Sequence, residues 1–361
     1  MNDILESDWQ TIKTSFQLGC DLAKVSPISS GHINETYLVE DEGRRWVLQN
    51  INNQVFPNPQ IIQQNFEKVS RHLSQKKYPL ENLKTQHTRN GHSLALTNGR
   101  SWRLINYIPN CKILDKADNA QQAFNAAQAV GIFNEALADM PFSEIKPVID
   151  GFHDLQLRLN QFNQSLLKNH NNRVAECMDE LEVIKKFASL ADWIPKAKAN
   201  HLIEKRIVHN DTKISNILIS NATGRAKAVI DWDTIMPGYL LYDYGDMVRS
   251  FVPTGGEDQP DNCYLRWDIL EALTEGYLSG VKDSLEEFEK ENLLVGAKII
   301  IFMIGVRFLT DHFNGDVYFK ITRENQNLDR ARTQFKLLEQ LSKNEKTWSK
   351  KLGLSRQSLK V

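Results

Sequence analysis

Apolar residues recur along this chain with two different spacings, which divide it into two unlike regions. Before about residue 110 the pattern is mostly alternating and broken by turns, as in short strands. It predicts two hairpins, turning at 41–43 and 98–99, because Asp-Glu-Gly and Asn-Gly favour tight reversals. The segment 59–73 instead has apolar residues at helical spacing. The first region is therefore predicted to be a small sheet with one helix.

Beyond residue 117 the apolar spacing becomes helical, with one exception. Segment 206–233 contains short apolar runs that flank a polar loop and predicts strands. We therefore expect an α+β protein of two lobes, residues 1–109 and 110–361, with a small mixed sheet in the first and mainly helices in the second. The predicted helices of the second lobe span 120–137, 173–190, 268–278, 293–313 and 329–341.

Composition and charge narrow the class of protein. A chain of 361 residues is too long for one small core, and a net charge of −1 argues against a nucleic-acid partner. The N-terminus lacks a basic, then apolar leader, and the apolar run 299–306 is shorter than the ~20 residues of a membrane span. We expect no membrane association and a cytoplasmic location. The oligomeric state is left open.

Three further segments carry weaker predictions. The four cysteines are scattered without metal-ligand spacing, which favours free thiols over a zinc site. The charge-dense run 282–292 is interpreted as the solvated face of a helix, and the basic segment 344–361 as a surface tail.

The polar loop in segment 206–233 holds the most informative pattern. Asp211 stands five residues before Asn216, and Asp231 ends the next apolar run. Transfer of a phosphoryl group needs a carboxylate that accepts the proton of the acceptor hydroxyl, and cations that neutralise the phosphate oxygens. Amide and carboxylate oxygens suit Mg²⁺. We assign Asp211 as the catalytic base, and Asn216 and Asp231 as Mg²⁺ ligands.

The same loop carries a family resemblance. His209-x-Asp211-x4-Asn216, followed by Asp231-Trp232-Asp233, resembles the aminoglycoside phosphotransferase and choline kinase superfamily, which shares the two-lobed protein-kinase fold. Longer segments at 29–37, 46–52, 209–238 and 305–320 are more closely similar to the N-acetylhexosamine 1-kinases. The resemblance implies transfer of the γ-phosphate of ATP to the C1 hydroxyl of GlcNAc or GalNAc, with Mg²⁺ as cofactor.

The resemblance also implies a nucleotide site in the first lobe. Residues 29–34 would form the loop that covers the phosphates, and segment 106–109 would bind adenine through its backbone. Gln49 stands where kinase folds usually place a lysine, and Gln64 or Glu67 would be its helical partner, although neither is suited to an ion pair with an amide. The implied nucleotide-binding residues are Ser30, Gly31, His32, Asn34, Gln49, Asn106 and Ile108.

The acceptor site is implied in the second lobe. Arg307 and Tyr318 would reach the sugar beside Asp211, and Phe251 would stack on the sugar face. Asp243 would brace the catalytic loop, with His209 and Asp233 in support.

Two alternatives remain at this point. One is another kinase of the superfamily acting on choline, homoserine or an aminoglycoside, although Arg307 would repel a cationic acceptor. The other is a nucleotide-binding pseudokinase, which Gln49 suggests and the intact Asp211, Asn216 and Asp231 oppose.

Overall fold

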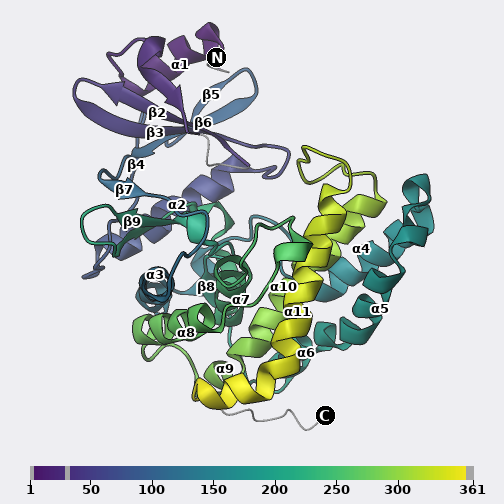
Figure 1. Ribbon diagram of the computed structural model, residues 1–361. Coiled ribbons are helices and arrows are strands. Elements are labelled where there is room, and N and C mark those ends of the chain that lie inside the picture. Colours follow the sequence, from purple (N-terminus) through teal and green to yellow (C-terminus); the bar gives the residue numbers. More distant parts are fainter. Residues whose placement is uncertain (1–3, 29–32, 355–361) are drawn as a thin grey trace.

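The computed structural model describes residues 4–28 and 33–354 and contains two lobes (Figure 1). A six-stranded sheet forms the first lobe, in the order β1-β2-β3-β6-β4 with β5 also paired to β6. Every pairing in it is antiparallel, so the sheet is not mixed as expected. Its strands are β1 Val25–Pro27, β2 Glu35–Asp41, β3 Arg44–Ile51, β4 Thr85–Gln86, β5 Ala95–Thr97 and β6 Arg100–Asn106.

Both predicted hairpins are present in this sheet. Glu42 and Gly43 join β2 to β3, and Asn98 and Gly99 join β5 to β6, all four with positive φ. Alternation of buried and exposed residues in β2 places Tyr37 and Val39 in the core of the lobe.

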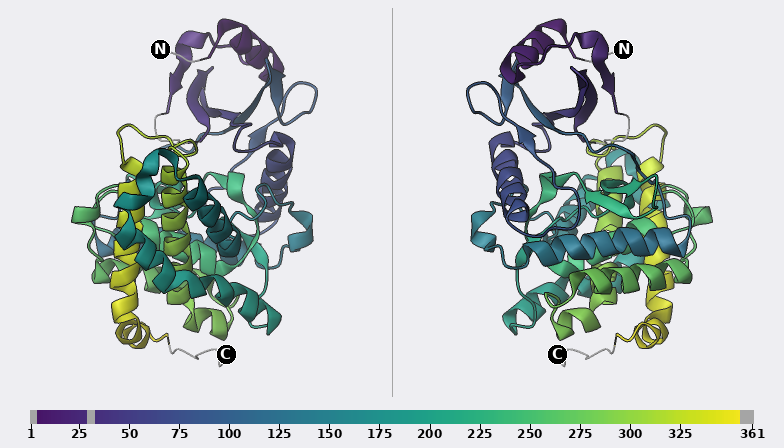
Figure 2. Two further views of the ribbon diagram at one scale, coloured as in Figure 1. Left: turned by 90° about the vertical axis from the view of Figure 1, so that its right-hand side faces the viewer. Right: turned by 90° about the vertical axis from the view of Figure 1, so that its left-hand side faces the viewer.

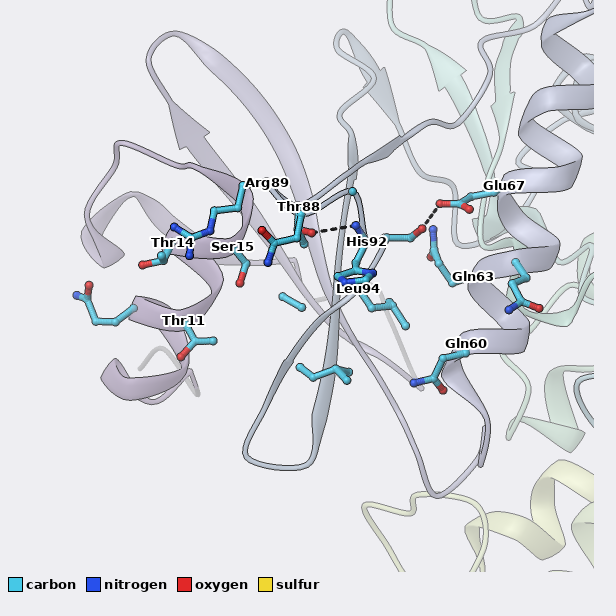
Figure 3. Close-up of a pocket in the computed structure, with 17 residues that line it drawn as sticks. Thr11, Thr14, Ser15, Gln60, Gln63, Glu67, Thr88, Arg89, His92 and Leu94 are labelled. Carbon is cyan, nitrogen blue, oxygen red and sulfur yellow. Dashed lines mark hydrogen bonds between the residues drawn. The ribbon is translucent and has the colours of Figure 1, made fainter.

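The first lobe has two helices, where one was expected. Helix α2 (Pro59–Ser74) fills the predicted range, begins with Pro59, and is capped by Asn58, whose side chain accepts from the Ile61 N–H. Helix α1 (Glu6–Phe16) was missed because only Trp9, Ile12 and Phe16 give it an apolar face. Between the two helices lies a cavity whose lining residues are drawn in Figure 3.

The second lobe is mainly helical and lies below the sheet lobe in both side views (Figure 2). Strand β7 (Cys111–Lys112) is already part of it, because it pairs with β9. The other short strands are β8 Arg206–Val208, β9 Ile217–Ser220, β10 Ala226–Val229 and β11 Met236–Gly238. The helices are α3 Ala120–Leu137, α4 Leu155–Lys168, α5 Met178–Phe187, α6 Trp193–Ala199, α7 Leu240–Phe251, α8 Trp267–Val281, α9 Glu287–Glu291, α10 Leu293–Phe313 and α11 Gln326–Lys351.

Small residues let helices α3 and α8 pack closely. A Cβ atom at Gly276 would lie 2.3 Å from the carbonyl oxygen of Phe124, and one at Gly280 would lie 2.4 Å from that of Gln128. A side chain at either position would force the helices apart.

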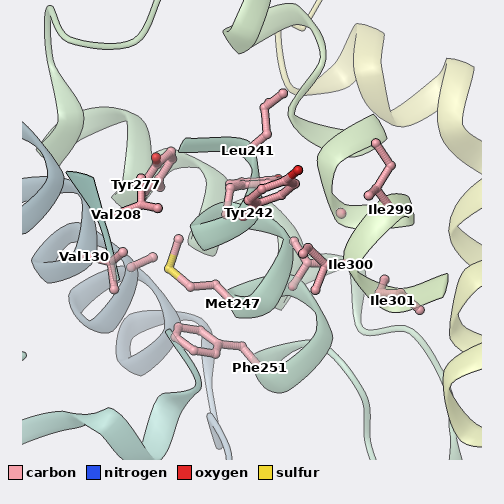
Figure 4. Packing of buried hydrophobic residues seen from close by; sticks show 14 of the residues in the cluster. Val130, Val208, Leu241, Tyr242, Met247, Phe251, Tyr277, Ile299, Ile300 and Ile301 are labelled. Carbon is pink, nitrogen blue, oxygen red and sulfur yellow. The ribbon is translucent and has the colours of Figure 1, made fainter. Parts of the chain in front are cut away.

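Helix α10 forms the centre of this lobe. Among the described residues it alone is long and apolar enough to cross a membrane by length and composition, but most of its side chains are buried against α4, α7 and α11. These neighbouring helices supply the apolar surroundings that its sequence requires. Figure 4 shows Ile299, Ile300 and Ile301 of α10 within this packing.

One prediction for the helical lobe was wrong and two hold only in part. Segment 173–190 is not one helix, because α5 is flanked by the 3-10 helices His170–Glu176 and Ala188–Asp192. In 282–292, Glu289 is buried and pairs with Arg206 at 2.9 Å, so this run is not simply a solvated face. Residues 344–351 continue α11, and Glu345 pairs with Lys298 at 2.8 Å, so this part is no free tail.

Candidate active site

The backbone of the loop between β8 and β9 is held by one carboxylate of α7. Asp243 is fully buried and accepts hydrogen bonds from the backbone N–H groups of His209 at 3.0 Å and Asn210 at 2.7 Å. Burial raises the pKa of Asp243 to about 6, although its hydrogen bonds and His209 oppose this. The loop is therefore fixed on α7 just before Asp211.

His209 joins this loop to the segment that carries the second carboxylate. Its Nε2 donates to the Ile230 carbonyl at 2.9 Å, and its Nδ1 accepts from the backbone N–H of Asp211 at 3.3 Å. The Thr234 hydroxyl donates to the His209 carbonyl at 2.8 Å. The positions of Asp211 and Asp231 are thus coupled through hydrogen bonds rather than left to two independent loops.

Asp211 lies between a cation and an amide. Its Oδ2 is 2.9 Å from Nζ of Lys213 and accepts from Nδ2 of Asn216 at 2.9 Å. Burial alone would raise the pKa of Asp211, but Lys213, His209 and Arg249 outweigh it and hold the pKa at about 2. Asp211 is therefore ionised at neutral pH and can accept a hydrogen bond from an alcohol.

Asp231 lacks such compensation. No hydrogen bond or ion pair reaches its carboxylate within the part of the chain that the structure describes. Burial and the neighbouring Asp233 raise the pKa of Asp231 to about 6. Its backbone is left-handed, with φ +63°, directly after β10. A buried carboxylate of this kind needs a cation to remain charged at low cost.

Mg²⁺ fits this arrangement. Nδ2 of Asn216 is used by Asp211, so the amide oxygen is the atom left for a metal, beside the uncompensated carboxylate of Asp231. The described residues contain no group of three or more His, Cys, Asp or Glu side chains arranged for a metal. Two oxygen donors suit Mg²⁺, which takes its remaining ligands from water and phosphates.

A buried arginine of the sheet lobe connects the lobes. Nη2 of Arg103, on β6, lies 2.6 Å from Oδ1 of Asp233, and both side chains are almost fully buried. Nε and Nη2 of Arg103 also donate to the side-chain oxygen of Gln49 at 2.9 and 2.8 Å. Asn34 donates to Oδ2 of Asp233 at 2.6 Å. Gln49 itself has no charge, but Arg103 on the neighbouring strand β6 places a positive charge beside the position where kinase folds usually have a lysine.

The expected helical partner of Gln49 is absent from this contact. Glu67 of α2 turns the other way, where the Ser93 hydroxyl donates to it and His87 lies 3.2 Å away. Gln64 lines the cavity on that same side. Helix α2 instead contacts the turn Trp232–Thr234, directly after Asp231, through Phe66, whose ring lies 5.0 Å from that of Trp232.

The other predicted nucleotide residues are only partly described. Ser30, Gly31 and His32 lie outside the described residues. Asn106 uses its side chain locally, accepting from the Lys84 N–H at 2.6 Å, and the side chain of Ile108 is buried in the core. Neither side chain is therefore directed at a ligand, and only the backbone of this segment remains available to one.

Side chains of both lobes meet around a small cavity of about 40 Å³. It is lined by Ile33, Asn34, Thr36, Gln49, Phe56, Asp211, Lys213, Asp231, Asp233 and Thr234. The structure therefore brings together the predicted base, one predicted metal ligand and two predicted nucleotide residues at the junction of the lobes.

Arg307 lies in an aromatic cage. Its guanidinium carbon is 5.6, 5.7 and 5.4 Å from the ring centres of Phe152, Tyr318 and Phe319, and its Nη2 donates to the Tyr318 hydroxyl at 3.5 Å. No carboxylate pairs with it among the described residues. Burial lowers the pKa of Arg307, and the charges of Tyr318 and Asp211 oppose this. A cation held without a counter-charge, within the field of Asp211, is available to a ligand.

The prediction that Phe251 stacks on a substrate is wrong. Its side chain is fully buried, and Figure 4 shows its ring beside Met247 in the hydrophobic cluster of the second lobe. Phe251 ends α7 on the inner face of that helix, so it packs the core and cannot reach a ligand.

Sequence reasoning also missed charged residues around Asp211. Lys213 lies between Asp211 and Asn216 in the sequence, and its position two residues after Asp211 could have indicated the ion pair between them. Arg249 pairs with Asp246 at 2.8 Å, and its charge helps to lower the pKa of Asp211. Nothing in the sequence indicated that Arg103 faces Asp233, because that contact depends on how the two lobes meet.

Comparison with known proteins supports this interpretation of the fold. An aminoglycoside phosphotransferase from Alicyclobacillus acidocaldarius superposes with a TM-score of 0.64 at 12% identity, covering 98% of each chain. A choline kinase from Cryptosporidium parvum gives 0.57 at 14% identity and 93% of each chain. A spectinomycin phosphotransferase, solved with ADP and spectinomycin, gives 0.54 at 12% identity, covering 94% of this chain and 100% of that one.

These similarities confirm the predicted fold class, which is the protein-kinase-like fold of aminoglycoside phosphotransferases. The profile of the Phosphotransferase enzyme family (APH) matches residues 24–278. The chain belongs to this family.

Proposed function

We propose that this protein is a kinase that transfers the γ-phosphate of ATP to the anomeric C1 hydroxyl of GlcNAc or GalNAc, giving the sugar 1-phosphate. One observation carries the proposal. The ionised Asp211 lies between Lys213 and Asn216 at the junction of the lobes, within the field of an Arg307 that has no counter-charge.

Asp211 has the position and charge of the group that orients the acceptor hydroxyl. With a pKa of about 2 it is a weak base, so it accepts the proton late, as the bond to phosphorus forms. Lys213 neutralises Asp211 before ATP binds and can turn to a phosphate oxygen afterwards.

The nucleotide side of the site would combine several weak contacts. Asn216 and Asp231 would hold Mg²⁺, which neutralises phosphate oxygens when bound. Arg103, which orients Asp233 and Gln49, would supply the positive charge that kinase folds usually place on a strand lysine. Asn34 and the loop residues Ser30, Gly31 and His32 would cover the phosphates, and the backbone at Asn106 and Ile108 would bind adenine.

The acceptor side favours a neutral ligand rich in hydrogen-bond acceptors. Arg307 and the exposed Tyr318 offer a guanidinium and a hydroxyl, which can bind sugar hydroxyls and the acetamido carbonyl. Choline and aminoglycosides are cations, which Arg307 and the nearby Arg158 would repel, whereas homoserine also carries a carboxylate and is distinguished by assay.

A coupled assay of ADP release with Mg²⁺ and a panel of acceptors tests the proposal. We expect turnover with GlcNAc or GalNAc and none with their methyl 1-glycosides, because methylation blocks the hydroxyl that receives the phosphate. Phosphorus NMR should locate the phosphate at C1. Turnover with choline, homoserine or an aminoglycoside and none with any hexosamine would reject the sugar as acceptor, while the proposal that the protein is a kinase would stand.

A further inference from the structure

A large cavity of the sheet lobe lies away from the candidate active site. It has a volume of about 990 Å³ and is bounded by α1, α2 and the connection from Thr88 to Leu96 (Figure 3). It shares no lining residue with the small cavity at the lobe junction. Helix α2 separates the two cavities. Its Phe66 contacts Trp232 in the turn after Asp231, whereas its Gln63 and Glu67 line the larger cavity.

Ten of the 17 residues that line it carry an amide or a hydroxyl, and none of them is Phe, Tyr or Trp. A nucleobase would find no such ring to stack on. The side chains with amides or hydroxyls are Gln10, Thr11, Thr14, Ser15, Gln60, Gln63, Gln64, Thr88, Asn90 and Ser93. This composition suits a ligand with many hydroxyl groups, because amides and hydroxyls can each donate and accept hydrogen bonds.

Gln63 shows that this wall is incompletely satisfied. Its side chain is 2% exposed and donates to the Thr85 hydroxyl at 2.7 Å, while its Oε1 is buried without a partner among the described residues. Flipping the Gln63 amide would let its oxygen accept from the Thr85 hydroxyl but would leave its nitrogen without a partner instead. An unsatisfied buried amide is costly, and a ligand hydroxyl in the cavity would relieve that cost.

The two charged side chains of the wall, Arg89 and Glu67, lie on opposite sides of the cavity (Figure 3). Glu67 is already used by the Ser93 hydroxyl and by His87, which lies 3.2 Å away. Arg89 is exposed, and within the described chain no carboxylate pairs with its guanidinium. Its backbone N–H donates to the Ser15 carbonyl of α1 at 2.8 Å, which fixes Arg89 on the side opposite Gln60 and Gln63, as Figure 3 shows.

We propose that this cavity is a second binding site, for a small phosphorylated sugar. Its phosphate binds Arg89 in the two-pronged geometry that a guanidinium offers, and its hydroxyls bind the amides and hydroxyls that extend to Gln63. The product of the proposed reaction belongs to this class, and so does any other sugar phosphate. The site does not depend on which alcohol the enzyme phosphorylates.

Isothermal titration of an Asp211→Asn protein, with no ATP present, tests the site without turnover. The probes are GlcNAc 1-phosphate, glucose 6-phosphate, GlcNAc and inorganic phosphate. The Asp211→Asn protein also carries Arg307→Ala, which removes acceptor binding in the active site, and this double variant is the parent for the comparisons. Arg89→Ala then tests the cavity, and Arg44→Ala, an exposed arginine of the same lobe outside it, is the matched control.

We expect a sugar phosphate to bind more tightly than GlcNAc or phosphate alone. Arg89→Ala should weaken it about 10-fold to 100-fold, as for loss of a charge-assisted pair, and Arg44→Ala should not. Hydrogen exchange should slow at residues 85–96 when the ligand is bound. Tighter binding of GlcNAc 1-phosphate identifies the product as the ligand, and tighter binding of glucose 6-phosphate identifies another sugar phosphate.

Equal affinities of Arg89→Ala and its parent for every probe would overturn the proposal. Thr14→Trp, which places a large ring on the exposed face of α1 at the cavity wall, gives a second test because it should block binding without removing a charge. Failure of the acceptor assay would leave these results unaffected, since they involve no catalysis.

Discussion

Arg103 and Asp233 form an ion pair of 2.6 Å that joins β6 of the sheet lobe to the turn after β10. The same guanidinium holds the side-chain oxygen of Gln49, and Asn34 holds the other oxygen of Asp233. Since Asp233 is two residues after Asp231, the pair fixes the sheet lobe against the proposed metal ligand. Its loss should affect both stability and nucleotide use.

Arg103→Met tests this relationship. It leaves Asp233 buried without its cation, so we expect a loss of about 3–5 kcal/mol in the free energy of unfolding and a higher KM for ATP. Urea unfolding and initial rates measure the two effects. Arg100→Met on the same strand breaks an exposed 3.5 Å pair with Glu35 and should cost less than about 1 kcal/mol.

A double variant separates the pair from the individual residues. Arg103→Met with Asp233→Leu removes both charges, so it should be more stable than Arg103→Met alone. If Arg103→Met and Arg100→Met unfolded at the same urea concentration, the ion pair would have no special structural role.

Asp211→Asn tests the catalytic carboxylate. It keeps the size of the side chain but cannot accept the proton, so kcat should fall by ~10²–10⁴. The thermal midpoint should fall modestly, because the amide can still accept from Asn216 but no longer neutralises Lys213. Asp246→Asn, which weakens the nearby pair with Arg249, is a matched control and should reduce kcat much less. A kcat of Asp211→Asn within a factor of two of the parent would exclude Asp211 as the base.

Sequence patterns predicted the parts of the fold that depend on local order. Helices α3 and α10 span the predicted ranges because their apolar residues repeat continuously, and the β2–β3 and β5–β6 turns carry residues that tolerate positive φ. Segment 173–190 looked like one helix because its periodicity continues through Cys177, where the backbone leaves the helical region with ψ 30°. A single residue with irregular backbone angles does not change the spacing of apolar residues, so the sequence pattern cannot reveal it.

The candidate site was predictable only where it is local. Asp211, Asn216 and Asp231 lie within 21 residues, just before β9 and just after its partner strand β10, so this local hairpin brings them together. The Arg103–Asp233 contact spans 130 residues and requires both the register of β6 and the docking of the lobes. Phe251 was misplaced for the same reason, because which side of α7 faces the core depends on tertiary packing.

Arg307→Met tests the acceptor site. Since no carboxylate pairs with Arg307 among the described residues, its removal leaves no buried charge uncompensated, and stability should change little. The KM for GlcNAc should rise about 10-fold to 100-fold, with the KM for ATP within about twofold. Arg330→Met, which removes another arginine lying over an aromatic ring, is the control and should leave the KM for GlcNAc unchanged. A higher KM for ATP but not for GlcNAc would place Arg307 on the nucleotide side.

His153 predicts how stability depends on pH. Its Nε2 donates to the Asn210 carbonyl at 3.1 Å, and its Nδ1 is buried without a hydrogen-bond partner among the described residues. Burial, together with the charges of Arg307 and Arg158, lowers the pKa of His153 to about 3, although the hydrogen bond to Asn210 and the charge of Asp211 oppose this. Between pH 6.5 and about 3 the unfolded chain therefore binds a proton that the folded chain does not.

Stability from this group is complete above pH 6.5 and is lost as the pH falls, by at most about 1.4 kcal/mol per pH unit. Urea unfolding at pH 7, 6 and 5 should show this decline, and His153→Gln, which keeps a donor for the Asn210 carbonyl but does not titrate, should reduce it. His92→Gln, at an exposed histidine, should leave the decline unchanged. Parallel pH profiles for His153→Gln and the parent protein would show that His153 is protonated equally in the folded and unfolded chain.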